Sequence, residues 1–579
     1  MKIGKIVEVI GTKVKAIIYE KMPPHLLYNT NIISAPQINT YVKTRIGLNT
    51  IICQIIGEYL KLDNKESKEI GYFVELEVKG RIQNKNFLGG LRLLPFVDAD
   101  VETLEKEDYE ILFSKPEFAI TIGTNLFDDF NKITLDINKL IPSHIGIFGN
   151  TGSGKSNTMA KILKEYLNLV KNYPNKINSK ILIFDLNNEY GNNAICKYLD
   201  KKVYNLTTRN NSGDKIPFRY DKITAEDWGI ILNATEKTQM PIIKKALENA
   251  KQNISQIPNY GIDLIKRLLL NPSVSNAQMF LTLRTYLHNY YNNISDIRYN
   301  KTTNSFYFYN NGSNRYIQSE NDLLNIVLNI ENNELDRFEF ELLLEIIKRS
   351  ESGINFDYIS PLIHRMANKK KELEKVFINN TSNEDFEKIL FDNKQVCVIQ
   401  LGRVNYEVRE MLPSLLSNIF FDSRIELRNN TKINNILNIV IDEAHNLLCK
   451  QEEQSEIHSS NLKTFEKIIK EGRKFGLFLM IASQRPSDIS NTITSQIHNY
   501  FIHKLVNPND IEKIRKTVAY MNESSLNMLT VLGKGECIIS GTSLYMPQYV
   551  YVDELDNEYK PDSEDIKILG NDGIVEINN

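Results

Sequence analysis

Residues 144–156 read HIGIFGNTGSGKS, a short apolar run that leads into a glycine-rich octet. The octet matches the phosphate-loop pattern G-x-x-x-x-G-K-[ST] in full. Its backbone N–H groups can wrap a β-phosphate, Lys155 can reach the β- and γ-phosphates, and the Ser156 hydroxyl can bind Mg²⁺. We therefore predict that ATP and Mg²⁺ bind here, through Gly149, Asn150, Thr151, Gly152, Ser153, Gly154, Lys155, Ser156 and Asn157.

A second apolar run, within LNIVIDEAHNLL (437–448), ends in the acidic pair that a phosphate loop requires. Asp442 is expected to hold Mg²⁺ through water, as the acidic residue at the end of a Walker-B strand does. Glu443 is expected to polarise the attacking water. Taken alone, Asp442 also fits a helix cap after a core strand, but its pairing with the phosphate loop favours the metal role.

The letters DEAH at residues 442–445 are also found in helicases of the DEAD/DEAH-box type. The separation between Lys155 and Asp442 is much longer than one compact domain of that class contains, and too little chain follows for a second ATPase domain. His445 is therefore expected to be a local packing or hydrogen-bonding residue.

Five short apolar runs favour a parallel sheet buried on both faces: residues 144–148, 180–185, 395–401, 438–444 and 477–483. Helical spacing of apolar residues follows the phosphate loop, at Met159, Ile162, Leu163, Tyr166, Leu167 and Val170. Residues 222–390 interrupt this α/β pattern with amphipathic helices and a possible hairpin at residues 305–318. We interpret them as a helical subdomain inserted in the core.

The first hundred residues alternate as strands do, with Val14, Ala16 and Ile18 on one face and Val74, Leu76 and Val78 on another. This pattern favours a small β-barrel or sandwich, and the acidic residues 97–110 look like a linker after it. The predicted fold is α/β, with residues 1–112 as barrel, 113–221 and 391–579 as the two parts of the ATPase core, and 222–390 as the insertion.

Composition places few limits on function. The formal net charge is −2, so any nucleic-acid surface must be local or built by assembly. Five dispersed cysteines read as reduced thiols rather than metal ligands or disulfides. No signal peptide is evident and no apolar run reaches the roughly 20 residues of a membrane span. We therefore expect a soluble, cytoplasmic protein.

The ordered set SHIGIFGNTGSGKSNT, ILIFDLNNEYG, NIVIDEAHNLL, EGRKFGLFLMIASQRPSDIS and SQIHNYFIHKLVNPND resembles the HerA family of hexameric ATPases. These are relatives of the FtsK DNA translocases within the RecA-like P-loop fold. The N-terminal stretch IGKIVEVIG is similar to the start of the small barrel that HerA shares with rotary ATP synthase subunits. The likeness covers most of the chain and is weakest in the insertion.

The resemblance implies further site residues. Gln484 matches the polar sensor, although it also fits a plain strand-end cap. Arg473 stands where the family has an arginine that reaches the neighbouring subunit's nucleotide; a solvated helix-end arginine is the alternative, and Lys474 or Arg485 can share the role.

Asp185 and Glu189 match acidic residues after the second core strand. They could support Mg²⁺ or water, or they could cap the strand–helix junction, and the sequence favours neither role. Ser540 and Gly541 match a closing strand near the nucleotide base, and a plain core strand explains them equally well. Ser143 departs from the family, because many members carry a basic residue there. If that residue contacts phosphate across the subunit boundary, this chain depends more on Arg473, and nearby Lys139 is a possible substitute.

The resemblance implies an ATP-driven homo-hexameric ring that translocates on duplex DNA through a central pore. It also implies an effector partner, either a nuclease or an NAD-consuming enzyme, that docks on the N-terminal barrel. The two proteins would work together in anti-phage defence or DNA-end processing. The alternative is an ATP-binding scaffold or allosteric regulator that activates a partner without processive translocation. A conjugative or secretion ATPase of the VirB4 type ranks third, because the sequence offers no membrane segment.

Overall fold

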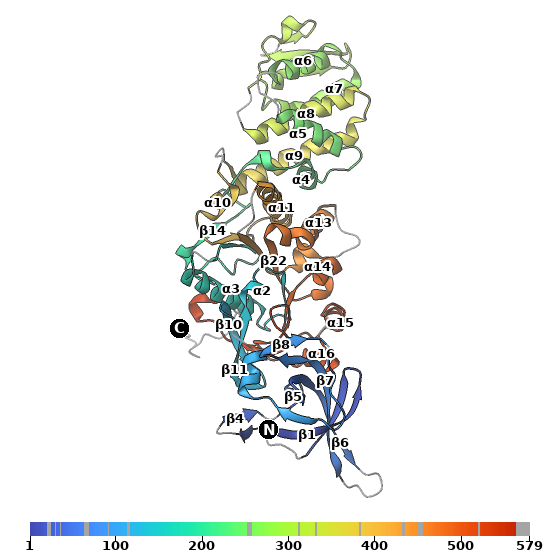
Figure 1. Cartoon of the computed structure of the whole chain (residues 1–579). Coiled ribbons are helices and arrows are strands. Elements are labelled where there is room, and N and C mark those ends of the chain that lie inside the picture. Colours follow the sequence, from blue (N-terminus) through green and yellow to red (C-terminus); the bar gives the residue numbers. More distant parts are fainter. Residues whose placement is uncertain are drawn as a thin grey trace, which may run out of the picture.

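The computed structural model describes residues 1–19, 25–28, 31–34, 36–62, 69–90, 92–112, 116–174, 177–251, 257–310, 313–329, 333–380, 384–430, 435–449, 456–518 and 521–562. Figure 1 shows an elongated molecule with the N-terminal barrel at its lower end, a central sheet with flanking helices, and a helical part at its upper end. The fold class is confirmed: an α/β P-loop core carries a small barrel and a helical insertion.

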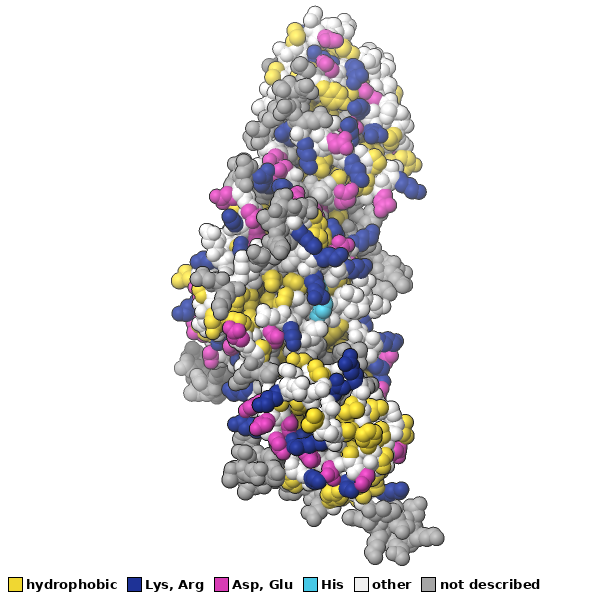
Figure 2. Space-filling view, in the orientation of Figure 1, with side chains coloured by type: hydrophobic (Ala, Val, Ile, Leu, Met, Phe, Trp, Pro, Cys, Tyr) yellow, Lys and Arg dark blue, Asp and Glu magenta, His cyan; other side chains and the backbone are white. Residues whose placement is uncertain are grey.

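Six N-terminal strands close into a barrel, in the order β2-β1-β9-β5-β6-β7 with β7 pairing back to β2. Inward-facing Val14, Ala16, Val74, Leu76 and Val78 are all buried, as their alternation predicts. Figure 2 shows hydrophobic side chains gathered over the lower right of this barrel. The strands are β1 (Lys2–Ile10), β2 (Lys13–Ile18), β5 (Tyr41–Ile46), β6 (Asn49–Leu62), β7 (Glu69–Gln83) and β9 (Asp100–Thr103), with β3 (His25–Tyr28), β4 (Asn31–Ser34) and β8 (Asn86–Gly89) beside them.

The acidic stretch at residues 97–110 is not a linker, so that prediction was wrong. It contains β9, which closes the barrel between β1 and β5, and the start of helix α1 (Lys106–Leu112). Val101 faces the core, and Asp108 forms an ion pair with the buried ammonium of Lys43 at 2.5 Å. The carboxylates that suggested a solvated linker are therefore partly used to neutralise a lysine inside the fold.

The central sheet has eleven strands in the order β11-β10-β25-β24-β23-β12-β22-β21-β13-β20-β14. The strands from β23 to β14 run parallel, and all five predicted apolar runs lie among them. The parallel strands are β12 (Ile145–Phe148), β13 (Ser179–Asp185), β14 (Lys201–Asn205), β20 (Val396–Gln400), β21 (Ile436–Ile441), β22 (Leu477–Ser483) and β23 (Asn499–Ile502).

Four antiparallel strands complete the sheet on the side nearest the barrel: β10 (Ala119–Asn125), β11 (Asp128–Asp136), β24 (Glu536–Gly541) and β25 (Gln548–Val552). The Tyr41 hydroxyl of the barrel donates to the carbonyl of Pro547 beside β25, at 2.9 Å. This contact ties the barrel to the sheet.

Helix α3 (Lys155–Asn172) follows the phosphate loop and buries every apolar residue that the helical spacing predicted. None of the described helices is long and apolar enough to cross a membrane. All five cysteines are free thiols. The other helices around the sheet are α2 (Ile137–Leu140), α10 (Phe386–Phe391), α11 (Tyr406–Asn430), α12 (His445–Leu448), α13 (Glu456–Glu471), α14 (Asn491–Ser495), α15 (Pro508–Thr517) and α16 (Glu523–Met528).

The insertion is helical, as predicted, and a short parallel pair between β15 (Ile216–Phe218) and β19 (Phe377–Asn379) joins its two ends. The predicted hairpin is formed by β17 (Ser305–Asn310) and β18 (Ser313–Tyr316), with β16 (Ile297–Asn300) beside β17. The helices are α4 (Ala225–Ile231), α5 (Met240–Ala250), α6 (Ile257–Leu270), α7 (Val274–Leu287), α8 (Glu334–Glu351) and α9 (Phe356–Val376).

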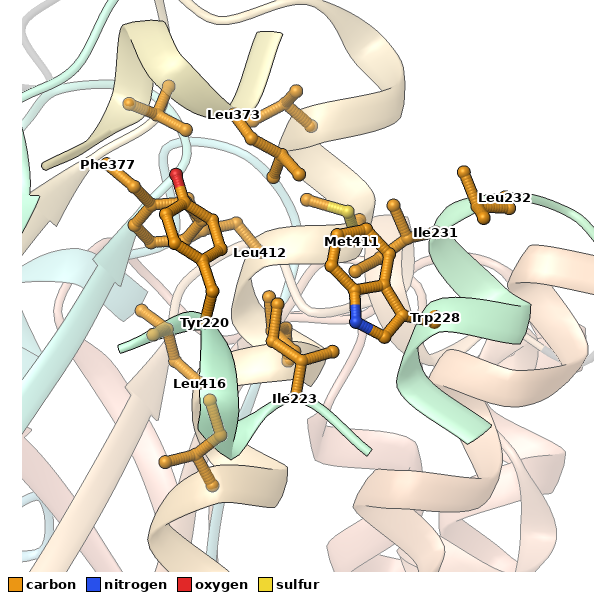
Figure 3. Close-up of a cluster of buried hydrophobic side chains, with 14 of the residues drawn as sticks. Tyr220, Ile223, Trp228, Ile231, Leu232, Leu373, Phe377, Met411, Leu412 and Leu416 are labelled. Carbon is orange, nitrogen blue, oxygen red and sulfur yellow. The ribbon is translucent and has the colours of Figure 1, made fainter. Parts of the chain in front are cut away.

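A continuous hydrophobic core joins the insertion to the ATPase core. Figure 3 shows Trp228 of α4 and Leu373 of α9 in one cluster with Met411 and Leu412 of α11. The Trp228 ring also stacks on Phe338 of α8, with 4.4 Å between ring centroids. The insertion therefore packs directly on the helix that follows β20.

Candidate active site

The predicted site residues gather where neighbouring parallel strands end. Phe148 at the end of β12 is paired with Ser483 at the end of β22, and β21 and β13 come next in the sheet. The phosphate loop, Gln484, Asp442 and the loop after Asp185 therefore leave the sheet at one edge. Ligands of open α/β folds bind at this edge.

The phosphate loop has the backbone that its glycines permit. Gly154 adopts φ 109°, a left-handed conformation, immediately before α3 begins. A Cβ on Gly149 would lie 2.5 Å from the Cβ of His503, so only glycine fits there. The Lys155 ammonium is folded back onto the loop and donates to the Asn150 carbonyl at 3.1 Å, while Ser156 is half-buried in the first turn of α3.

Asp442 is held from two directions. One carboxylate oxygen accepts from the backbone N–H of Glu443 at 2.9 Å, and the other accepts from the hydroxyl of Tyr190 at 3.1 Å. The tyrosine is fully buried, and its carbonyl accepts from the Lys201 ammonium at 2.6 Å. Tyr190 therefore fixes the direction of the Asp442 carboxylate relative to the phosphate loop.

Glu443 is the centre of a second group of contacts. Its carboxylate accepts from the amide of Gln484 at 3.3 Å and lies 3.3 Å from Nδ1 of His445. The Gln484 carbonyl in turn accepts from the Thr151 hydroxyl. Glu443 itself has φ 48°, a conformation that few non-glycine residues adopt and that is common at active sites. His445 thus has the hydrogen-bonding role that was expected of it.

Three carboxylates surround one lysine. Burial and the charge of Glu443 raise the pKa of Asp442 to about 6, and burial and the charge of Asp442 raise the pKa of Glu189 to about 7. Burial also lowers the pKa of Lys155, while the three carboxylates oppose that shift. The site therefore carries more negative charge than Lys155 can neutralise, which favours the binding of a cation.

Replacing Glu189 with glutamine is expected to raise the melting temperature of the nucleotide-free protein at about pH 8 by about 2–4 °C, after a discount for partial exposure. The raised pKa means that the folded state holds this proton more tightly than the unfolded chain does. Stability is therefore lost as the pH rises from 4.5 towards 7, and glutamine removes the loss. Thermal unfolding of both proteins across this range measures it.

Glu236→Gln, which removes one carboxylate from the exposed surface, is the matched control. An equal gain for Glu189→Gln at low and high pH would contradict the prediction, because the ionised form would then not be the source of the cost.

Asp185 has the capping role rather than an open metal-binding position. Its two oxygens accept from the backbone N–H groups of Glu189 and Tyr190, both at 2.9 Å, and the amide of Gln400 donates to it at 3.4 Å. Glu189, by contrast, has a buried carboxylate oxygen without a hydrogen-bond partner in the described part of the chain. Of these two acidic residues, Glu189 is the one that faces the nucleotide side.

Residues around the C-terminal strands β24 and β25 contact the phosphate loop and the start of α3. The Gly535 N–H donates to the Ser153 carbonyl at 2.9 Å, and the Asn157 side chain bonds the backbone of Asp553 and Leu555. Asn157 therefore holds this segment in place. His503, buried below the loop, bonds the Thr158 hydroxyl and the Glu536 carbonyl, both at 2.9 Å.

The register of these strands corrects the expectation for Ser540 and Gly541. They oppose Tyr500 and Asn499 of β23, and Asn499 aligns with Ile145 at the start of β12. This is the edge opposite the phosphate loop, and Ser540 is buried. The residues that do meet the loop are Gly535 and Asp553, because β24 begins where the phosphate loop begins.

Arg473 lies at the opposite edge from its own phosphate loop. It belongs to a 3₁₀ turn (Gly472–Phe475) before β22, whose seven residues span about 20 Å to Gln484 at the other end. Arg473 is exposed, and Lys474 shares the same turn. Arg485 follows Gln484 directly, so it lies at the edge of its own site, 3.9 Å from Asp488. Of the three cations, Arg485 is therefore the one at the edge of its own site, while Arg473 and Lys474 are exposed at the opposite edge.

Ser143 has a structural role here. Its hydroxyl donates to the Leu140 carbonyl at 2.5 Å and accepts from the Asn499 amide at 2.8 Å, so its proton is already committed within the fold. Lys139 points elsewhere, with its ammonium 5.0 Å from the centroid of the Tyr545 ring. His498, by contrast, is close to Arg473, and its pKa is lowered by burial and by the Arg473 guanidinium.

Sequence reasoning did not identify Tyr190, Lys201 or His503. Tyr190 directly follows Glu189 within the stretch ILIFDLNNEYG, and His503 directly follows β23. Their positions just after strands were the sequence signal that could have identified them. Lys201 gave none, because its contact depends on the order of strands in the sheet.

One protein family and several helicases are similar to this chain. The family described as "Helicase HerA, central domain" matches residues 120–420. A probable helicase of Methanocaldococcus jannaschii is 23% identical over 92% of this chain and 89% of its own length. The DNA double-strand break repair helicase HerA of Sulfurisphaera tokodaii is 26% identical over 85% of this chain and 81% of its own. Among solved structures, VirB4 of Thermoanaerobacter pseudethanolicus has a TM-score of 0.45 at 13% identity, over 77% of this chain and 98% of that one.

Proposed function

This chain belongs to the HerA helicase family, and from that premise we propose that it is an ATP-driven translocase that moves on duplex DNA as a homo-hexameric ring. The proposal that the chain hydrolyses ATP rests on one observation: at one edge of the sheet lie Lys155, Asp442, Glu443 and Gln484. The proposal that the chain moves on DNA is supported by the names of its relatives, which include DNA double-strand break repair helicases.

The residues present fit ATP and Mg²⁺. The phosphate loop offers successive backbone N–H groups at the start of a long helix, and the excess of carboxylates around Lys155 suits a divalent cation. Ser156 and Asp442 are the residues that would hold Mg²⁺, which supplies neutralisation of phosphate charge when it is bound. The Lys155 ammonium would exchange the Asn150 carbonyl for the β- and γ-phosphates.

Glu443 is proposed as the general base. Its carboxylate is held by Gln484 and by His445, and Gln484 bridges it to Thr151 of the phosphate loop. A water placed between Glu443 and the γ-phosphate would lose a proton to this carboxylate as it attacks. Gln484 is proposed as the sensor, since the same amide contacts the base and the loop.

Arg473 is proposed to complete the site of the neighbouring subunit. It cannot reach its own phosphate loop across the length of β22, and it is exposed. A permanently charged planar guanidinium suits the charge that builds on a γ-phosphate. Head-to-tail contacts between a phosphate loop and the opposite edge of the next subunit close into a ring when the rotation closes.

An effector, either a nuclease or an NAD-consuming enzyme, is proposed to dock on the barrel. On the outer face of the barrel, Ile17 is paired with Phe73 and Phe73 with Tyr59, and the two aromatic rings stack 5.6 Å apart. Tyr59 is 40% exposed. An apolar row of this kind on a surface is suited to a protein partner. If the partner rather than DNA controls ATP turnover, the ring acts as a scaffold or allosteric regulator.

Steady-state ATP hydrolysis by the full chain, with and without linear duplex DNA, tests the proposal. Several-fold stimulation by DNA that is abolished in Lys155→Ala is the expected result. Hydrolysis that ignores DNA and responds only to an effector would overturn the translocase in favour of the scaffold.

A further inference from the structure

A polar cavity of about 370 Å³ opens at the same edge of the sheet as the phosphate loop, farther along towards β14. The segments after β14 and after β20 form it, and every lining residue is polar or glycine. Two arginines, Arg209 and Arg403, and one acid, Asp214, are the charged groups in its lining. A cavity lined mainly by polar groups and carrying a net positive charge suits an anionic ligand.

The two segments are held together by hydrogen bonds. The Thr207 hydroxyl donates to the Arg403 carbonyl at 3.4 Å, and the Asn405 N–H donates to the Thr208 hydroxyl at 2.8 Å. Asp214 is occupied in part, because one of its oxygens accepts from the Asn205 N–H at 2.8 Å. The backbone that carries the two arginines is therefore fixed relative to the sheet.

Both guanidinium groups are available to a ligand. Arg209 and Arg403 are exposed, and neither side chain has a hydrogen bond or ion pair within the described part of the chain. Two lysines nearby, by contrast, are paired: Lys375 with the Thr208 carbonyl and Lys369 with Glu372. A guanidinium binds phosphate through two parallel donors, so two free guanidinium groups in one cavity suit a phosphodiester backbone.

The cavity is connected to the nucleotide site by a short chain of contacts. Next to Arg403, the Gly402 N–H donates to the Asn188 side-chain oxygen at 3.0 Å. A Cβ on Gly402 would lie 2.7 Å from the Asn188 amide, so the two residues fit closely. Asn188 directly precedes Glu189, which faces Lys155, and Tyr190, which holds Asp442.

We propose that Arg209 and Arg403 bind backbone phosphates of DNA, and that the Gly402–Asn188 contact transmits this binding to Glu189 and Tyr190. This inference rests on the proposed DNA translocase function and assigns it a contact site. It also supplies a physical route by which DNA can change the rate of ATP hydrolysis, because a shift of Asn188 moves the residue that orients Asp442.

The test compares the full chain with Arg209→Ala/Arg403→Ala. The control, Lys244→Ala/Lys245→Ala on α5, removes the same charge from a distant exposed surface. Affinity for a fluorescent linear duplex is measured over a salt series, together with ATP hydrolysis with and without that duplex. The arginine variant is expected to bind DNA about ten-fold more weakly, and the slope of log affinity against log salt is expected to fall by about 1 for each phosphate that is no longer neutralised.

The arginine variant should also lose DNA stimulation while its DNA-free hydrolysis stays within about two-fold of the unmodified chain, since neither arginine faces the phosphate loop. Asn188→Gly keeps the left-handed backbone and removes the amide, so it should bind DNA normally but respond to it weakly.

Several outcomes would overturn the inference. DNA affinity and stimulation unchanged in the arginine variant would leave the translocase proposal intact and remove only this site. Loss of DNA-free hydrolysis would assign the arginines to nucleotide phosphates instead. If the unmodified chain neither binds DNA nor responds to it, the proposed function fails, and this inference fails with it.

Discussion

Replacing Glu443 with glutamine is expected to slow ATP hydrolysis by about 10²–10⁴, the range that a positioned general base contributes. Glutamine keeps the shape and can still contact Gln484, but it cannot take a proton from the attacking water. Nucleotide affinity should stay close to that of the unmodified chain, because the phosphate loop and Lys155 are untouched. Single-turnover hydrolysis and the binding of a fluorescent ATP analogue measure the two properties separately.

Lys155→Ala is the informative comparison, since it should lose affinity as well as turnover. Asp488→Asn serves as the matched control, because this carboxylate lies beside the site near Arg485 and has no proposed part in hydrolysis. Turnover by Glu443→Gln near that of the control would show that another group accepts the proton, and Glu189 would be the first candidate.

Replacing Arg473 with alanine is expected to reduce ATP hydrolysis by about 10³–10⁵, the range for arginines that act on a neighbour's γ-phosphate. The substitution should not unfold the protein, because the turn that carries Arg473 is held by backbone contacts. Arg424 donates to the carbonyls of Phe475 and Gly476, and Arg428 donates to the carbonyl of Lys474. Steady-state hydrolysis and thermal unfolding of the same samples check both statements.

Mixing two inactive variants distinguishes action between subunits from action within one. Arg473→Ala retains an intact phosphate loop, and Lys155→Ala retains Arg473, so a mixed ring should contain sites with both groups and regain activity. A sample of Arg473→Ala alone, treated in the same way, should regain no ATP hydrolysis. If the mixture of the two variants also stays inactive while both proteins assemble, Arg473 does not act on a neighbour, and Lys474 becomes the next residue to test.

The sequence determines the parts of this protein that depend on adjacent residues. A phosphate loop binds phosphate through consecutive N–H groups, so its eight residues carry most of the signal, and Asp442 and Glu443 follow their strand directly. The barrel strands and α3 are predictable for the same reason, because alternation and helical spacing report burial locally. Membership of the HerA family follows from the order of such local motifs.

Tertiary structure decides which strand ends meet. Parallel strands joined by long crossovers can be ordered in many ways, and here β22 and β21 lie between β12 and β13. That order brings Gln484 to Glu443 and Tyr190 to Asp442, although these pairs are 41 and 252 residues apart. It also sends Arg473, Ser540 and Gly541 to the opposite edge. Sequence spacing contains no information about this order, because the packing of the whole sheet determines it.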